Sequence, residues 1–218
     1  DQDESNVIDY EEQLKRIRRL RQKEFDEEKK SQPPMFNLPA PVKLICFLIL
    51  VPFAVLEIWA NFSPRILGEA YMQFGFVPAR WMGEMPFDWY TPFSLLSFNF
   101  LHGGLLHVGM NVLMLLAFGA GVVRYVGPVR FYALFFLGSF AGVVAHFIFY
   151  MHSGDPVVGA SAGISSLFGA LILLMQRSGN MMAGAFGIWP FVILWVFVSI
   201  LFGSMGTPNG DAVAWVAH

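Results

Sequence analysis

The sequence predicts an all-α membrane protein, a polytopic bundle of six transmembrane helices whose sixth helix is truncated in this chain. Three observations predict it. Of the 218 residues, 56% are apolar, against roughly 45–50% in soluble domains. Residues 1–30 hold 18 of the 30 Asp, Glu, Lys and Arg side chains, which leaves 12 for the other 188 residues. Apolar runs of about 20 residues, the length that crosses a bilayer, recur from residue 42 onwards.

The same numbers exclude several classes of protein. Residues 40–218 carry too few charges to cover the surface of an ordinary soluble enzyme. The single cysteine, Cys46, excludes a disulfide framework and a Cys-rich metal site. A net charge of −2 gives no footprint for nucleic acid, so we expect no nucleic-acid partner. The first 30 residues contain no apolar stretch of the kind found in a secretory signal peptide.

Residues 1–38 form the first predicted unit, a cytoplasmic, charged and helical amino-terminal segment. Acidic and basic residues alternate there with sparse apolar ones, which is typical of a solvated helix, and Ser31-Gln-Pro-Pro34 ends it. A helix that binds a partner is the alternative interpretation. Residues 39–218 form the second predicted unit, a transmembrane domain that we expect to be incomplete at its carboxyl end.

Within the second unit, the apolar runs follow one another with short gaps. The long exception, 63–100, is rich in aromatic residues such as Trp81 and Trp89, which indicates a structured loop at the membrane surface. The predicted spans are 42–62, 101–123, 129–151, 157–175, 186–202 and a sixth from 212 onwards.

Basic residues set the predicted orientation. If the spans alternate, the amino-terminal basic cluster, Lys43, Arg124, Arg130 and Arg177 fall on one side. The positive-inside rule then places the amino end in the cytoplasm and the 63–100 loop outside. We expect a multi-pass integral protein of a bacterial inner (plasma) membrane.

Polar residues inside lipid are costly, so each is a candidate functional residue. With a rise of about 1.5 Å per residue, His107 lies roughly 9 Å below the outer surface and Asn111 one turn deeper. Ser161 lies about 6 Å down and His218 about 9 Å down on their own spans. Three helices thus place a Ser, two His and an Asn in one layer.

Those four residues supply the parts of a serine hydrolase. A hydroxyl needs a base such as neutral imidazole, and the oxyanion that forms needs N–H donors. Because no Asp or Glu lies at this depth, a Ser-His dyad is favoured over a triad. The small residues of Gly159-Ala-Ser161-Ala-Gly163 would leave the hydroxyl accessible. The alternative is that this run, like Gly138 and Gly142, serves only helix packing.

The motifs resemble those of one known family. His102-Gly-Gly-Leu-Leu-His107-Val-Gly-Met-Asn111 resembles the H-x-x-x-x-H-x-x-x-N signature of rhomboid intramembrane serine proteases, Gly159-Ala-Ser161-Ala resembles their G-x-S-G motif, and Ala217-His218 resembles their alanine-histidine pair. Three positions differ: Ala162 replaces the motif glycine, and Phe93-Ser94 replaces a Trp-Arg pair.

The resemblance implies roles for individual residues. Ser161 would be the nucleophile, His218 the general base, and the Ser161 N–H, His107 and Asn111 the oxyanion hole. His102, Gly159 and Gly163 would support the site. The implied reaction is peptide-bond hydrolysis in transmembrane substrates within the lipid bilayer, with no cofactor and no metal.

Three other functions are alternatives to this one. A rhomboid-like protein that binds transmembrane clients without cutting them is the first, and a small polytopic transporter is the second. The transporter is disfavoured because the spans carry almost no charged residues. A metalloprotease is disfavoured because the chain has no H-E-x-x-H motif and because His102 and His107, five residues apart, would point to different helix faces.

Overall fold

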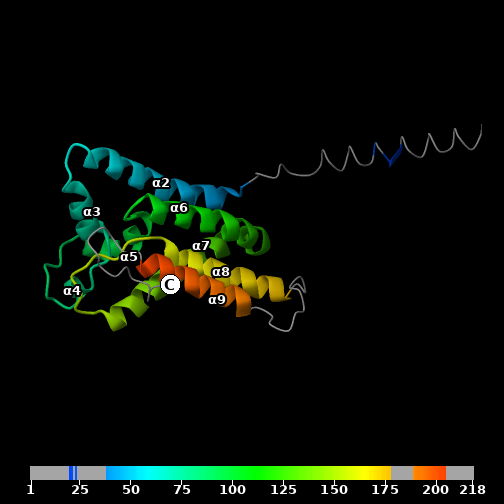
Figure 1. Cartoon of the computed structure of the whole chain (residues 1–218). Helices are drawn as coiled ribbons and strands as arrows, with labels where there is room; N and C mark the ends of the chain where they lie inside the picture. The colour runs from blue at the N-terminus through cyan, green and yellow to red at the C-terminus, as the bar shows by residue number, and fades with distance from the viewer. Residues whose placement is uncertain (1–19, 22, 24–37, 178–188, 205–218) are drawn as a thin grey trace, which may run out of the picture. The chain divides into compact units, whose positions relative to one another are not determined.

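The computed structural model describes residues 20, 21, 23, 38–177 and 189–204, and the structural statements below concern these residues. The chain divides into two units, Asp1–Asn37 and Leu38–His218. Every regular element in the described part is a helix, so the predicted all-α class is confirmed (Figure 1). The elements are α2 (Ala40–Ala60), α3 (Ile66–Phe74), α4 (Pro78–Trp81), η1 (Thr91–Phe93), α5 (Ser94–Ser97), η2 (Phe98–Phe100), α6 (Leu105–Met114), η3 (Leu115–Gly119), α7 (Ala120–Phe149), α8 (Ser161–Arg177) and α9 (Trp189–Ser204).

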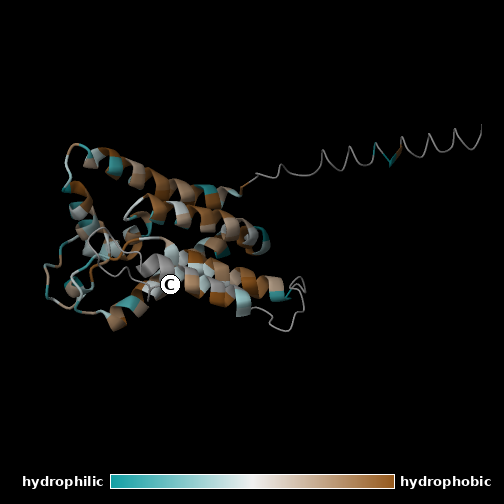
Figure 2. Cartoon of the chain, viewed as in Figure 1, coloured by the Kyte–Doolittle hydropathy of each residue, from teal (hydrophilic) through white to brown (hydrophobic). Residues whose placement is uncertain are grey.

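α2 is a membrane-length helix with one buried stripe. Pro41 lies in its first turn, where a missing N–H removes no hydrogen bond within the helix. Large apolar side chains such as Phe47 and Ile58 are exposed on its other sides, and apolar residues cover most of the helices in Figure 2. This is the surface expected of a helix that faces lipid. The buried residues, three or four apart, are Val42, Ile45, Ile49 and Phe53.

The helical stretch Leu105–Phe149 joins two predicted spans. It and α2 are the two described helices that are long and apolar enough to cross a membrane. Gly127 interrupts it with φ +80° and ψ 171°, just before Pro128. Gly119 and Phe131 would lie about 18 Å apart along a straight helix, yet a Cβ atom on Gly119 would lie 3.3 Å from the Phe131 ring. The chain therefore folds back at Gly127 into two arms, as the predicted gap between residues 123 and 129 requires.

The first arm contains a π-helical turn, η3 (Leu115–Gly119). A π-helical turn holds about one residue more than an α-helical turn, and such turns are rare. Leu115, where η3 begins, is fully buried, and Gly119, where it ends, is buried too. η3 begins one helical turn after Asn111 along the chain.

α8 packs along the second arm through small residues. A Cβ atom on Gly163 would lie 2.8 Å from the Phe135 carbonyl oxygen. Gly138 likewise lies directly against the Ser166 side chain, whose hydroxyl donates a 2.7 Å hydrogen bond to the Leu134 carbonyl. Close backbone approach through small residues is how helices pack in membranes. The helix-packing interpretation of Gly138 and Gly163 is therefore confirmed.

α9 contacts the bundle through aromatic rings. Trp195 stacks on Phe168 with ring centroids 4.8 Å apart, and its edge contacts Phe118 at 5.4 Å. Trp189 and Ile193 of the same helix are exposed. α9 covers most of the predicted fifth span. The predicted sixth span and most of the amino-terminal segment lie outside the described residues.

The predicted starts of two spans are wrong by four residues, and a glycine with positive φ lies just before each observed start. The second span begins at Leu105 rather than residue 101, because Gly104 has φ +156° and interrupts the helix. The fourth begins at Ser161 rather than residue 157, because Val157 pairs with Phe76 in an extended bridge and Gly159 has φ +123°.

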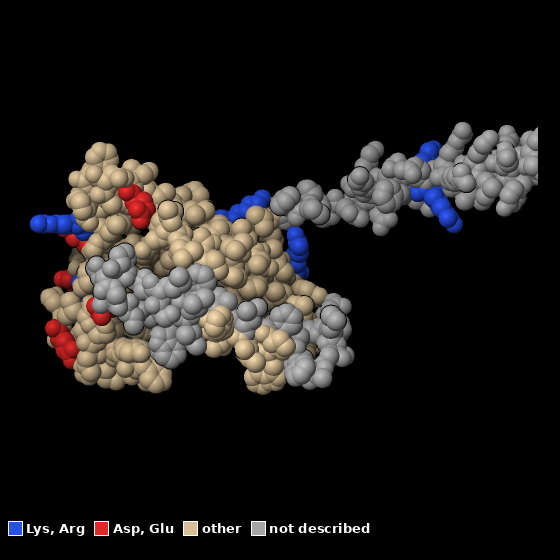
Figure 3. All heavy atoms as spheres, viewed as in Figure 1, with Lys and Arg blue, Asp and Glu red and all other residues tan. Residues whose placement is uncertain are grey.

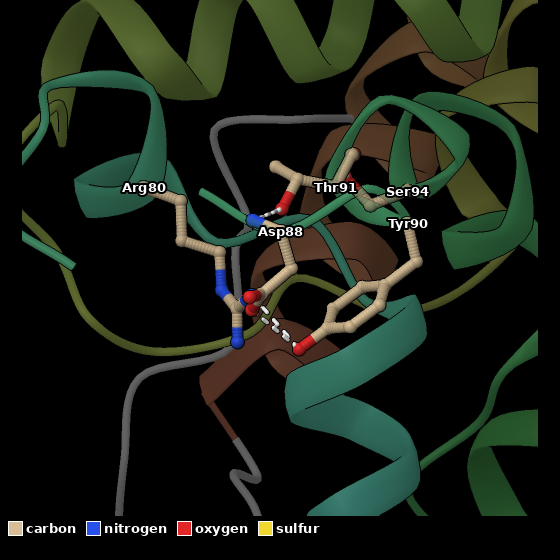
Figure 4. A network of polar contacts seen from close by, with 5 residues as sticks. All are labelled: Arg80, Asp88, Tyr90, Thr91 and Ser94. Atoms are coloured by element: carbon tan, nitrogen blue, oxygen red, sulfur yellow. Dashed lines mark hydrogen bonds and ion pairs between the residues drawn. The ribbon is translucent and has the colours of Figure 1, made fainter. Parts of the chain in front are cut away.

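The long loop is structured, as its length predicts. It contains five short helices and an anchored turn (Figure 4). Arg80 donates to the Asp88 carboxylate at 3.2 Å, and the Tyr90 hydroxyl donates to the same oxygen at 2.6 Å. The Asp88 N–H donates to the Thr91 hydroxyl, and the Ser94 hydroxyl donates to the Thr91 carbonyl. These contacts fix the turn that leads towards α6.

Charge is distributed towards the ends of the bundle. In Figure 3, acidic side chains gather at the end that carries α3 and α4, and the described surface between the ends is uncharged in this view. Lys43 lies in the first turn of α2, Arg124 and Arg130 flank the Gly127 turn, and Arg177 ends α8. An uncharged belt between charged ends suits a protein that crosses lipid.

Candidate active site

Ser161 is the first residue of α8, and the long loop holds the segment before it. Phe76 and Val157 exchange two backbone hydrogen bonds of 3.0 and 2.8 Å, and the Gly159 N–H donates to the Phe98 carbonyl at 2.8 Å. The first N–H groups of a helix have no partner within the helix and carry a partial positive charge. Three hydrogen bonds to the loop therefore fix a serine at a helix end suited to an anion.

The His107 ring packs against Gly159, two residues before this serine. A Cβ atom on Gly159 would lie 2.7 Å from His107 Nε2 and 3.9 Å from Ser161 Oγ. No side chain fits at that point, and the φ of +123° disfavours one independently. The glycine thus lets the imidazole of α6 and the hydroxyl of α8 approach the same small region.

Asn111 lies one turn further along α6 and is 5% exposed. Its Nδ2 donates a 2.9 Å hydrogen bond to the His107 carbonyl. Because a primary amide carries two N–H bonds, one remains for another acceptor. His107 and Asn111 therefore lie on one side of α6.

His102 precedes α6 and is 1% exposed. Its ring contacts the His107 ring edge-on, with centroids 4.9 Å apart. The prediction that these two histidines point to different helix faces is wrong. His102 is not on the helix at all, because α6 begins at Leu105, after Gly104, so the five-residue spacing does not set where its ring points.

Ala162, the residue that replaces the motif glycine, is buried at 5% exposure. The next residue is the one that must be glycine. A Cβ atom on Gly163 would lie 2.5 Å from Ser139 Oγ and 2.8 Å from the Phe135 carbonyl oxygen. In this chain the close approach of α8 to α7 therefore depends on Gly163.

His218, the predicted base, lies outside the described residues. Among residues 38–177 and 189–204, no group of three or more His, Cys, Asp and Glu side chains is arranged to hold a metal ion.

Sequence reasoning missed two residues of the long loop. Arg80 belongs to none of the motifs, but it is 9% exposed and paired with Asp88. Tyr71 received no role, yet its hydroxyl donates a 2.7 Å hydrogen bond to the His102 carbonyl. Arg80 could have been noticed as one of two cations in a stretch that holds three acidic residues. Nothing in the sequence marks Tyr71, because its partner is a backbone carbonyl 31 residues away.

The arrangement suits acyl-transfer chemistry. A hydroxyl at a helix amino end, beside an imidazole and a nearby amide, offers a nucleophile and several N–H donors within one region. The residue predicted to act as the base for the hydroxyl, His218, lies outside the described residues.

Comparison with known proteins covers the same region. The Rhomboid domain family model matches residues 87–218. The chain is 26% identical over 180 residues to Rhomboid protease GluP of Bacillus subtilis, and the alignment covers 82% of this chain and 33% of that protein. It is 34% identical over 82 residues to RHOMBOID-like protein 9, chloroplastic, of Arabidopsis thaliana, with 38% of this chain and 18% of that protein covered. It is 30% identical over 135 residues to Rhomboid-related protein 2 of Mus musculus, with 56% of this chain and 42% of that protein covered.

The chain spans less than half the length of each of these relatives. The family match, however, extends over more than half of this chain and contains α6, α8 and the residues around Gly159. The apolar helices and the uncharged belt of this chain are those of an integral membrane protein. On the strength of that match, the chain belongs to the rhomboid family.

Proposed function

We propose that this protein is an intramembrane serine endopeptidase that hydrolyses peptide bonds in or near the transmembrane segments of membrane proteins. One observation carries the proposal most directly. Ser161 Oγ and His107 Nε2 both lie within 4 Å of a single point beside Gly159, at the amino end of α8. Family membership adds support, because one relative is named a rhomboid protease.

In the proposed reaction, Ser161 Oγ attacks the carbonyl carbon of the scissile bond, and its proton passes to the His218 imidazole. The carbonyl oxygen becomes an oxyanion that accepts hydrogen bonds from the Ser161 N–H, the His107 ring and the Asn111 amide. When the C–N bond breaks, the leaving amine takes the proton from His218. Water, deprotonated by the same imidazole, then hydrolyses the acyl-enzyme.

The supporting residues have separate tasks in this proposal. Gly159 lets the His107 ring approach the Ser161 hydroxyl, and Gly163 lets α8 pack closely against α7. His102 contacts the His107 ring edge-on and would hold it in place. No cofactor or metal takes part.

The proposed topology has six membrane spans. Five are α2, the two arms that meet at Gly127, α8 and α9, and the sixth begins near residue 212. Residues 1–38 and the turn at Gly127 would lie in the cytoplasm, and the 63–100 loop outside, since the basic residues favour that orientation. The substrates would be transmembrane proteins of the same membrane, a bacterial inner (plasma) membrane.

The test is cleavage of a purified transmembrane substrate in proteoliposomes. Ser161→Ala should lower the cleavage rate about a thousandfold or more, since loss of a serine nucleophile leaves only residual catalysis. Ser165→Ala, one turn along the same helix, is the matched control and should cleave normally. A fluorophosphonate should label Ser161, and His218→Ala should abolish that labelling.

Two results would count against the proposal. Equal cleavage by Ser161→Ala and the control would exclude Ser161 as the nucleophile. Binding of the substrate without cleavage or labelling would favour the client-binding alternative.

A further inference from the structure

We propose that Tyr71 is a positioning residue for this site, whose hydroxyl holds the His102 carbonyl and thereby keeps the His102 ring against the His107 ring and the His107 ring against Gly159. The inference rests on the proposed function, because its consequence is a correctly placed oxyanion donor. Tyr71 lies on α3, in the long loop and outside the membrane-spanning helices.

The segment that Tyr71 holds has little stiffness of its own. His102 is followed by Gly103 and Gly104, and Gly104 adopts φ +156°. Glycine populates both signs of φ readily, so two in succession permit many paths into α6. A hydrogen bond of 2.7 Å from a different helix selects one of them.

Tyr71 is itself well placed to act as a fixed donor. The N–H of Gly75 donates to the Tyr71 carbonyl at 2.9 Å, and the Ser97 hydroxyl donates to the Phe74 carbonyl at 2.6 Å, so the end of α3 is tied to α5. Burial, together with the charge of Glu57, raises the pKa of Tyr71 to about 12. The phenol therefore keeps its proton, and remains a donor, throughout the neutral pH range.

The contacts continue from this hydrogen bond to Gly159, two residues before the nucleophile. The His102 ring lies edge-on to the His107 ring at 4.9 Å, and His107 Nε2 would lie 2.7 Å from a Cβ atom on Gly159. A displaced His102 therefore displaces the His107 ring. Misplacement of a catalytic group by about 1 Å can lower a rate a hundredfold.

The first test compares Tyr71→Phe with Tyr125→Phe. Both remove one tyrosine hydroxyl, but only Tyr71 donates to the His102 carbonyl, whereas Tyr125 lies on α7 and is 55% exposed. With concentrations set by fluorophosphonate titration, Tyr71→Phe should lower kcat about tenfold, the value of one typical hydrogen bond, and leave KM within about twofold. Tyr125→Phe should change neither constant by more than about twofold.

A double-mutant cycle separates positioning from a general structural effect. If Tyr71 acts through His107, Tyr71→Phe should have almost no further effect in a His107→Ala background. The same tenfold loss in both backgrounds, or no loss in either, would overturn the inference.

A second measurement needs no catalysis. In a Ser161→Ala background, diethyl pyrocarbonate should modify the buried His102 several times faster when Tyr71 is Phe, as read by mass spectrometry of the peptide. Equal modification would overturn the inference even if Tyr71→Phe proved unstable as an enzyme. If the parent chain cleaves no substrate, the proposed function fails, and this measurement still decides whether Tyr71 holds the His102 segment.

Discussion

Replacing Gly163 by Ala should destabilise the bundle by forcing α8 away from α7. The new methyl group would lie 2.5 Å from Ser139 Oγ, 2.8 Å from the Phe135 carbonyl oxygen and 2.9 Å from the Phe135 ring. The carbonyl belongs to a helix backbone, so a side-chain rotation cannot relieve that contact. The two helices must separate by several tenths of an ångström.

The magnitude follows from two opposing effects. Overpacking of this kind lowers the free energy of unfolding by about 1–3 kcal/mol. Replacing Gly by Ala inside a helix raises it by about 0.5–1 kcal/mol. Gly169→Ala, on the same helix with nothing within 4 Å of the new methyl group, gains the second effect alone. The difference between the two variants therefore isolates the overpacking.

The assay is equilibrium unfolding of both variants in the same detergent micelles. Gly163→Ala should be less stable than Gly169→Ala by about 1–3 kcal/mol. Adding Ser139→Ala should recover only part of the difference, because the Phe135 carbonyl remains in the way. Equal stability of Gly163→Ala and Gly169→Ala would refute this account of the α7–α8 contact.

Two further predictions concern the site and the loop. Gly159→Ala should lower substrate cleavage at least tenfold, because the methyl group displaces His107 and the backbone is strained by about 1–3 kcal/mol. Gly109→Ala, with open space around the new methyl group, should cleave at the parent rate. Arg80→Gln should lower the free energy of unfolding by about 1–2 kcal/mol through loss of a charged hydrogen bond. Replacing the exposed Arg65 in the same way, Arg65→Gln, should leave the unfolding temperature unchanged. Equal unfolding temperatures for these two variants would contradict the anchoring role of Arg80.

The apolar runs predicted most of the described helices because lipid imposes a length and a composition on any segment that crosses it. Helix ends were less predictable. Leu105 and Ser161 begin their helices where they do because of the backbone conformations at Gly104 and Gly159. The start of α8 at Ser161 also depends on hydrogen bonds from loop residues far away in the sequence.

The candidate site, too, could be predicted from the sequence only in part. His107 and Asn111 could be grouped from the sequence, since four residues apart on one helix means one face. The contact of His102 with His107 could not, because it depends on the backbone conformation at Gly104, which leaves His102 outside the helix. The burial of Arg80 depends likewise on the turn formed by Asp88 and Tyr90, which no local pattern in the sequence indicates.

The π-helical turn Leu115–Gly119 has a consequence for how this helix tolerates changes in chain length. A deletion elsewhere in an α-helix rotates everything on one side of it by about 100°. A deletion within the wider turn converts it to an ordinary α-helical turn and absorbs the change. His107 and Asn111 above it would keep their direction towards Gly159, and the arm below would keep its buried face. When rhomboid sequences of different lengths are aligned with this one, a one-residue gap in this helix belongs between residues 115 and 119.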